Sequence, residues 1–330
     1  MKYNKSIGWI LSAGLAASLF TANAQSAVVF EETFDQSPPI ALSTRGSTTT
    51  EWIKRQGTLR GKITTAQMGD GVLDITTTEQ DYGGASTGRS DLYDFFNQEL
   101  TYTFSGINLQ PVGQSQPANQ WAKFGVFASD GSLWYGGSMF LVGFNGKGRF
   151  TLQVKQPSLQ TNTIESLYVK DFKVPYFNFD IADISKVKIT LDDTYFRILF
   201  IFKNELDQIS FGGEHGLDRD RWFVDSVYLW RAKAELDQAQ IAYDDAVASG
   251  DQARIDAALA ALQAAQDAYD AKYAEADPLK GDTSVFISAS STDATYLRSS
   301  NLEAGANLKI DTLRVETTNV LDVLRNPPAP

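Results

Sequence analysis

The stretch KVKITLDDTYFRILFIF, residues 186–202, decides the fold of this chain. In its first half Val187, Ile189 and Leu191 alternate with polar residues, so an extended strand there has one apolar face and one polar face. The pair Asp192-Asp193 then supplies a turn before a second run of strand-forming residues. One face on a core and one face in water is typical of antiparallel sheets. The stretch therefore predicts an antiparallel β-hairpin.

The same period of two recurs along the chain in short runs bounded by turn-forming residues. The predicted strands are 28–34, 71–77, 99–104, 121–128, 138–144, 149–155, 186–191, 194–202, 208–211, 222–230, 284–289 and 308–316. Residues 139–144 and 198–202 are apolar on both faces, so we expect them to lie centrally or under a covering loop. Together the runs predict a mainly β fold, an antiparallel sandwich of two sheets, with enough chain for one large core.

Residues 231–277 break this pattern, because they are rich in Ala, Gln, Asp and Glu. Apolar or seam residues recur there at steps of three and four: Leu236, Ala239, Tyr243, Ala246, then Ile255, Leu259, Leu262, Gln266, Tyr269 and Tyr273. Gly250 and Asp251 fit the end of one helix and the start of another, and Pro278 ends the second. We therefore predict an inserted antiparallel helical hairpin.

The expected organisation has four parts. Residues 1–24 are a signal peptide, 25–230 together with 280–318 form the β-sandwich domain, 231–277 form the helical insertion, and 319–330 form a C-terminal tail. The leader assignment rests on Lys2 and Lys5 before an uncharged apolar run at 7–20, followed by the small residues Ala22-Asn23-Ala24.

The apolar run of the leader is shorter than the roughly 20 residues of a spanning helix. No second run of that length follows. We therefore expect an exported protein without a transmembrane segment, located in the periplasm, outside the cell or on its surface.

Charge and cysteine content exclude several functions. The chain has 29 Lys and Arg against 40 Asp and Glu, a net charge of −11, and removal of Lys2 and Lys5 would leave 27 − 40 = −13. Such a surface repels phosphate backbones, which argues against a nucleic-acid partner. The absence of cysteine excludes disulfides, thiol catalysis and thiolate metal sites.

Four segments carry a resemblance to a known family. They are FEETFD at 30–35, GVLDI at 71–75, KVKITL at 186–191 and VDSVYL at 224–229, in this order. Together they resemble the concanavalin A-like lectin/glucanase superfamily, including laminin-G-like domains, over residues 28–316. The resemblance implies a jelly roll of two curved sheets, with ligands, usually glycans, on the concave face or rim loops.

The resemblance implies no particular activity, because this fold hosts lectins, hydrolases, lyases and adhesion modules. The chain departs from the family in two ways. It carries the helical insertion, and it lacks the Glu-x-Asp-x-Glu strand motif of the best-known glucanases. The second departure argues against hydrolase activity of that type.

The densest polar cluster lies in residues 214–221 and gives the candidates for catalysis. His215 is the one histidine of the chain, and an imidazole is a natural base near neutral pH, with Glu214 beside it. Asp218 and Asp220 are spaced as in oxygen-rich loops and could help bind a structural calcium ion; no other cofactor is expected. The alternative interpretation is a salt-linked turn with an incidental histidine.

Aromatic residues give the candidate ligand-binding set. Trp121 and Lys123 share the strand face opposite the more apolar one, and Trp134-Tyr135 follows a predicted turn. Aromatic rings beside polar groups can form a stacking platform for sugars. The alternative is that Trp121 packs under the helical insertion or a long loop.

Three functions follow from these observations. The first is an exported, non-catalytic carbohydrate-binding or cell-surface module, with a glycan as its partner. The second is a polysaccharide-cleaving enzyme, a glycoside hydrolase or lyase, on the same scaffold. The third is a structural or adhesion protein whose helical hairpin binds a protein partner.

Overall fold

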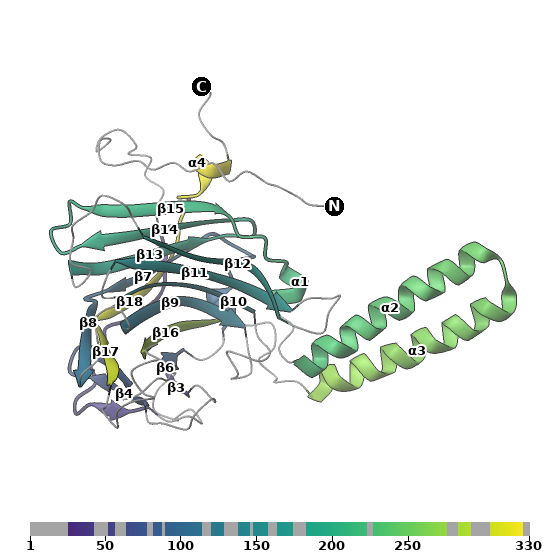
Figure 1. The fold of residues 1–330 in the computed structure, drawn as a ribbon, viewed down its shortest axis with the longest axis horizontal. Coiled ribbons are helices and arrows are strands. Elements are labelled where there is room, and N and C mark those ends of the chain that lie inside the picture. The colour runs from purple at the N-terminus through teal and green to yellow at the C-terminus, as the bar shows by residue number, and fades with distance from the viewer. Residues whose placement is uncertain are drawn as a thin grey trace.

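The computed structural model describes residues 26–42, 52–56, 64–77, 82–87, 90–113, 120–128, 138–145, 148–157, 164–173, 183–222, 227–275, 283–291 and 304–325. These residues form three antiparallel sheets and a pair of long helices that extends away from them (Figure 1). The predicted leader, residues 1–24, lies outside the described residues. The end of the predicted tail, 326–330, lies outside them as well.

Residues 186–202 form a hairpin within a six-stranded sheet. In sheet order the strands are β1 (Val28–Glu32), β18 (Thr312–Thr317), β7 (Leu100–Ser105), β13 (Ile184–Leu191), β14 (Tyr195–Phe202) and β15 (Gln208–Glu214). Ile189 pairs with Ile198, and Lys188 pairs with Leu199. The predicted antiparallel hairpin is therefore confirmed, with its turn at Asp192 and Asp193.

A seven-stranded sheet packs against the first. In sheet order its strands are β12 (Ile164–Lys173), β11 (Arg149–Pro157), β10 (Ser138–Asn145), β9 (Gln120–Ala128), β16 (Ser284–Ser291), β6 (Tyr82–Ser86) and β3 (Ile53–Gln56). Every residue of β10 is buried, and the strand lies in the interior of the sheet. The expectation that residues 139–144 lie centrally is therefore confirmed.

A third, five-stranded sheet contains strands that showed little alternation in the sequence. In sheet order they are β2 (Ile40–Ala41), β4 (Thr64–Gly69), β5 (Val72–Thr77), β17 (Ala304–Ile310) and β8 (Asn108–Gly113). The predicted strand 308–316 is interrupted at Asp311, so that β17 and β18 belong to different sheets.

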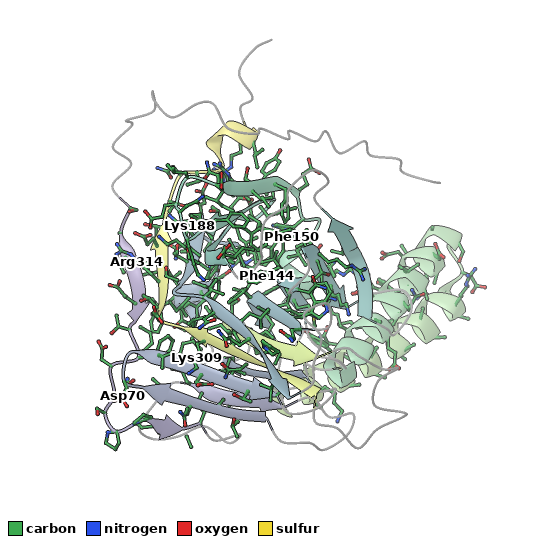
Figure 2. All side chains as sticks on the ribbon, turned by 60° about the vertical axis from the view of Figure 1, so that its left-hand side comes forward. Asp70, Phe144, Phe150, Lys188, Lys309 and Arg314 are labelled. Atoms are coloured by element: carbon green, nitrogen blue, oxygen red, sulfur yellow. The ribbon has the colours of Figure 1, made fainter. Side chains whose placement is uncertain are left out.

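Aromatic side chains fill the space between the two larger sheets. The rings of Phe150 and Phe200 lie 4.8 Å apart between centroids, and those of Phe144 and Phe200 lie 5.9 Å apart in an edge-on arrangement. Figure 2 shows Phe144 and Phe150 within this interior. All three side chains are fully buried, so the alternating residues of both sheets share one core. The predicted mainly β sandwich of facing antiparallel sheets is the fold observed.

The predicted strand 222–230 is wrong at the residues that the structure describes, 222 and 227–230, which are helical. A short helix, α1 (Arg219–Trp222), ends at Trp222, and α2 begins at Val227, four residues before the predicted start of the insertion. Val227-Tyr-Leu-Trp has strand-forming side chains, but it continues directly into the Ala-rich helix, and helix extension costs less than starting a new element. The closing strand of the resemblance, 224–229, is therefore also wrong where the chain is described.

The helical hairpin itself is confirmed as α2 (Val227–Ser249) and α3 (Gln252–Glu275), packed against each other. Gly250 turns between them with φ of +70°. Most predicted seam residues whose side chains are described are at least half-buried, but Leu259 is 49% exposed, and its neighbour Ala258 is more buried. The arm extends away from the sheets (Figure 1).

The described chain also contains η1 (Asp91–Tyr93) and α4 (Asp322–Arg325). None of the helices in the described ranges has both the length and the apolar character needed to cross a membrane.

Candidate functional site

The outer face of the seven-stranded sheet, the side turned away from the six-stranded sheet, carries the predicted residues Trp121 and Lys123. Both lie on β9, where alternate residues such as Phe124 point into the core. Trp121 and Lys123 are each only 7% exposed. They are therefore largely covered side chains and not an open platform, which agrees with the alternative interpretation of Trp121.

One end of this outer face is apolar. Phe127, Met139, Leu141 and Phe286 form a buried cluster separate from the main core. The rings of Phe127 and Phe286 meet edge to face with centroids 5.6 Å apart. This cluster fixes strands β9, β10 and β16 against one another on their outer side, beside the polar residues further along β9.

Next to the apolar cluster, Lys123 and Thr151 meet over Gly143. Gly143 of β10 pairs with Lys123 of β9 on one side and with Thr151 of β11 on the other. A Cβ atom at position 143 would lie 2.9 Å from Cγ of Lys123 and 3.2 Å from Cγ2 of Thr151. Only glycine leaves room for both side chains to lean across the middle strand, so the side-chain stem of Lys123 and the methyl group of Thr151 approach the same point.

The hydroxyl of Thr151 is an unsatisfied polar group. Thr151 is 3% exposed, and its Oγ1 has no hydrogen-bond partner within the described chain. The hydroxyl of Ser284, on the same outer face, is likewise buried and unpartnered among the described residues. A buried hydroxyl without a partner costs about 1–3 kcal/mol. Such groups need an explanation, and a ligand that supplies the missing hydrogen bond is one.

Lys155 adds a second amine on this face. It pairs with Met139 of the apolar cluster. Partial burial lowers the pKa of Lys155 below its ordinary value. The outer face therefore combines an indole, two amines and unpartnered hydroxyls.

The predicted catalytic residue His215 lies elsewhere, in the main core. It is 3% exposed and packs edge-on against Phe95 with ring centroids 5.8 Å apart. Its Nδ1 accepts a hydrogen bond from the backbone N–H of Leu217 at 3.0 Å. Its Nε2 lies 2.9 Å from the carbonyl oxygen of Asp192, to which it must donate. Both ring nitrogens are therefore occupied by backbone groups in one fixed neutral tautomer.

This geometry conflicts with the predicted role of His215 as a base, because no ring nitrogen is free to accept a proton. Burial lowers the pKa of His215 below its ordinary value, and the bond to Asp192 and nearby carboxylates offset this only in part. Glu214 is exposed and precedes His215 at the end of β15, where successive side chains point to opposite sides. The sequence placed the two together, but the fold separates them.

Of the two predicted calcium ligands, the structure describes the side chain of Asp218 only. Asp218 is the N-terminal cap of α1, since its Oδ1 accepts a hydrogen bond from the backbone N–H of Arg221 at 3.1 Å. The side chain of Asp220 lies outside the described part. No group of three or more His, Asp or Glu side chains that could hold a metal occurs among the described residues.

The predicted residues Trp134 and Tyr135 lie outside the described residues. The sequence did not indicate Thr151 and Ser284. A threonine or serine in a strand of alternating apolar and polar residues is expected to face solvent. Finding Thr151 required the register that places Gly143 between Lys123 and Thr151, and finding Ser284 required the pairing of β16 with β9.

Comparisons with known proteins give similarity of fold. Neither a protein-family model nor a curated protein sequence matches the chain. Among solved structures, the chain is similar to a basic winged bean lectin crystallised with Tn-antigen, at 11% identity and a TM-score of 0.42, covering 89% of this chain and all of the lectin. It is also similar to lectin II from Ulex europaeus, at 12% identity and a TM-score of 0.41, covering 88% of this chain and 100% of that one.

The catalytic domain of an endo-1,3-beta-glucanase (laminarinase) from Thermotoga petrophila is another similar structure. It shares 10% identity at a TM-score of 0.41, with 89% of this chain and 99% of that chain covered. Lectins and a glucanase thus stand together among the neighbours, and at this level of similarity the function has to be argued from the residues of this chain.

Proposed function

We propose that this protein is an exported, non-catalytic carbohydrate-binding module, and that its glycan contacts come from the outer face of the seven-stranded sheet around Trp121, Lys123 and Thr151. The observation that supports the proposal best is the buried, unpartnered hydroxyl of Thr151 beside Lys123 over Gly143. Sugars present hydroxyl groups that can donate to or accept from such a group.

The chemistry of these residues suits a sugar. The indole of Trp121 offers an apolar edge to the C–H groups of a pyranose ring, and the amine of Lys123 can donate to ring or hydroxyl oxygens. The low exposure of both side chains implies that a ligand reaches only their edges unless neighbouring groups move. Trp134 and Tyr135 stay predicted as further contacts.

The alternative enzymatic function relied on His215 as the general base, and both ring nitrogens of His215 are hydrogen-bonded to backbone groups. The third function, a protein partner at the helical arm, stays a prediction. Thr151 and Lys123 support glycan binding. No comparable group among the described residues supports either alternative.

A glycan array with the mature protein tests the proposal, using Thr151→Val as the decisive variant. The substitution removes the hydroxyl and keeps the shape, so the melting temperature should stay equal or rise slightly, since an unsatisfied group is lost. Binding to the glycan found with the unchanged protein should weaken about tenfold, the equivalent of one hydrogen bond of roughly 1.4 kcal/mol.

Thr65→Val is the matched control, because Thr65 lies exposed on β4 in the five-stranded sheet. It should bind as the unchanged protein does. Unaltered affinity of Thr151→Val, or an array without any bound glycan, would remove this face as the binding site.

A further inference from the structure

The outer face of the six-stranded sheet, turned away from the core, carries a group of cations that the proposed glycan site does not use. Lys186 and Lys188 lie on β13, and Arg197 lies on the neighbouring strand β14. Leu199 and Ile201 pair with the two lysines and are half-buried among them. We call these five residues the cationic face.

No carboxylate neutralises the cationic face within the described chain. Lys186, Lys188 and Arg197 form no ion pair or hydrogen bond with any described side chain, in contrast to Arg314, which pairs with Glu316 at 3.0 Å. The chain as a whole carries a net charge of −11. Three unpaired cations side by side on a strongly acidic protein are therefore a local exception.

The spacing of the cations is regular. Residues two apart on a strand lie about 6.6 Å from one another on the same face, so Lys186 and Lys188 repeat along β13 at this distance. Arg197 pairs with Thr190, the next position of that row. The cations thus extend along one line of the sheet and do not converge on one point, which suits a chain of anionic groups better than a single ion.

A second observation points to a ligand at the same place. Thr103 of β7 lies directly between Lys188 and Arg314, pairing with both. It is 8% exposed, and its hydroxyl has no hydrogen-bond partner in the described residues; Nε of Arg314 is buried and unpartnered there as well. Figure 2 labels Lys188 and Arg314 on this sheet.

We propose that the cationic face binds an anionic polysaccharide, a polymer with repeated carboxylate or sulfate groups, at a site separate from the glycan site on the other sheet. Each anionic group accepts charge-assisted hydrogen bonds from Lys186, Lys188 or Arg197. Leu199 and Ile201 contact the apolar faces of the sugar rings between the charges. A small movement of the lysine side chains opens the hydroxyl of Thr103 to an anionic oxygen.

Charge argues for a polysaccharide over a nucleic acid. Glu31 and Glu316 stand beside Arg314 at one border of the sheet, so only a narrow strip is positive. The dense phosphates of a nucleic acid would meet these carboxylates and the acidic surface beyond them. A polymer with more widely spaced charges can bind the cations without placing an anionic group against these carboxylates or against the acidic surface.

The test measures binding of the full mature protein to immobilised polygalacturonate, dextran sulfate, neutral dextran and a DNA duplex. At about 10 mM ionic strength, where the Debye length is about 30 Å, polygalacturonate or dextran sulfate should bind and neutral dextran should not. Binding should disappear near 1 M salt, where the Debye length is about 3 Å.

The decisive variant is the triple substitution Lys186→Gln, Lys188→Gln and Arg197→Gln, which should weaken polyanion binding by tenfold or more, since it removes all three charge-assisted contacts. Arg254→Gln on the exposed surface of α3 is the matched control and should bind as the unchanged protein does. Circular dichroism melts confirm that the variants fold. Equal binding by the triple variant, absence of polyanion binding at low salt, or preference for DNA would each overturn the proposal.

Discussion

The surroundings of His215 show how neighbouring groups decide what a single residue can do. In the sequence it stands among charged residues, which suggested an accessible base. In the fold the chain turns at Gly216, where φ is +71°, and the imidazole enters the core beside Phe95 and Phe140. The backbone of Leu217 and the carbonyl of Asp192 then take up both nitrogens. His215 therefore links the end of β15 to the turn of the quoted hairpin.

The buried neutral state of His215 predicts acid sensitivity. Its pKa in the folded protein is lowered, so below the unfolded value of about 6.5 the unfolded state binds the proton first. Stability is therefore full above that pH and is lost as the pH falls toward the folded pKa, by up to about 1.4 kcal/mol per pH unit. Urea titrations between pH 7.5 and 5 should show this decline.

His215→Gln is the control for the acid sensitivity, because glutamine can keep one of the two backbone bonds and does not titrate. We expect it to be less stable at pH 7.5 and to lose the decline between pH 7 and 5. A His215→Gln protein with the same pH slope as the unchanged protein would mean that other groups cause the effect.

Among the residues of the candidate site, the sequence indicated Trp121 and Lys123 but not Thr151. An aromatic residue on the polar face of a strand can be recognised from the sequence of that strand alone. The importance of Thr151 depends on its burial and on its place across Gly143, and both follow only from pairing between β9, β10 and β11. Pairing partners are set by the whole sheet, so single-strand patterns do not reveal them.

At the scale of elements, the helical arm is stabilised mainly by local interactions. Glutamine amides donate to aspartates one turn later along both helices, as in Gln240 to Asp244 at 2.9 Å and Gln263 to Asp267 at 3.0 Å. Ala246 is fully buried between the helices, whereas Ile241 remains 54% exposed. An arm with so small an apolar seam depends on its caps and local pairs.

The cap of α3 gives a prediction at this scale. Oδ1 of Asp251 accepts hydrogen bonds from the backbone N–H groups of Ala253 at 3.0 Å and Arg254 at 3.3 Å. Asp251→Ala should destabilise the arm by about 1 kcal/mol, the usual cost of losing a helix cap. Hydrogen exchange should show faster exchange in the first turns of α3, and exchange in the sheets should not change.

Asp245→Ala, an exposed position of α2 without a cap role, is the matched control. Exchange in α3 should stay as in the unchanged protein. If Asp251→Ala also leaves α3 unchanged, the tip of the arm does not depend on this cap.

Strands with a clear period of two were found from the sequence, and those without it were missed. The run TTAQMG of β4 and the run NLQPVG of β8 carry few apolar residues at alternate positions, and Pro111 argues locally against a strand. Pro111 is tolerated because β8 is an edge strand, where a missing N–H leaves no partner unsatisfied. Neighbours in the five-stranded sheet, not local sequence, hold these strands.

At the scale of the whole molecule, the C-terminal segment closes over the six-stranded sheet. After β18 the hydroxyl of Thr318 donates to Oε1 of Glu99 at 2.7 Å, and the backbone N–H of Leu321 donates to Oε2 at 3.1 Å. Arg325 of α4 then binds the carboxylate of Asp192 directly, and its Nη1 lies 3.6 Å from Oε2 of Glu99. The predicted tail is therefore partly a structural element, which reaches the turn of the quoted hairpin.

Removing the guanidinium should loosen this closure. The side chains of Glu99 and Asp192 are only 5% and 3% exposed, whereas that of Arg325 is 36% exposed. We therefore expect Arg325→Met to cost about 2 kcal/mol, between the value of a surface pair and that of a fully buried one. Urea unfolding of Arg325→Met, Asp192→Asn and the double variant measures the coupling energy between Arg325 and Asp192.

Arg254→Met on the arm is the control and should melt as the unchanged protein does. If the two single effects simply add, Arg325 and Asp192 act independently, and the closure rests on the backbone bonds to Glu99.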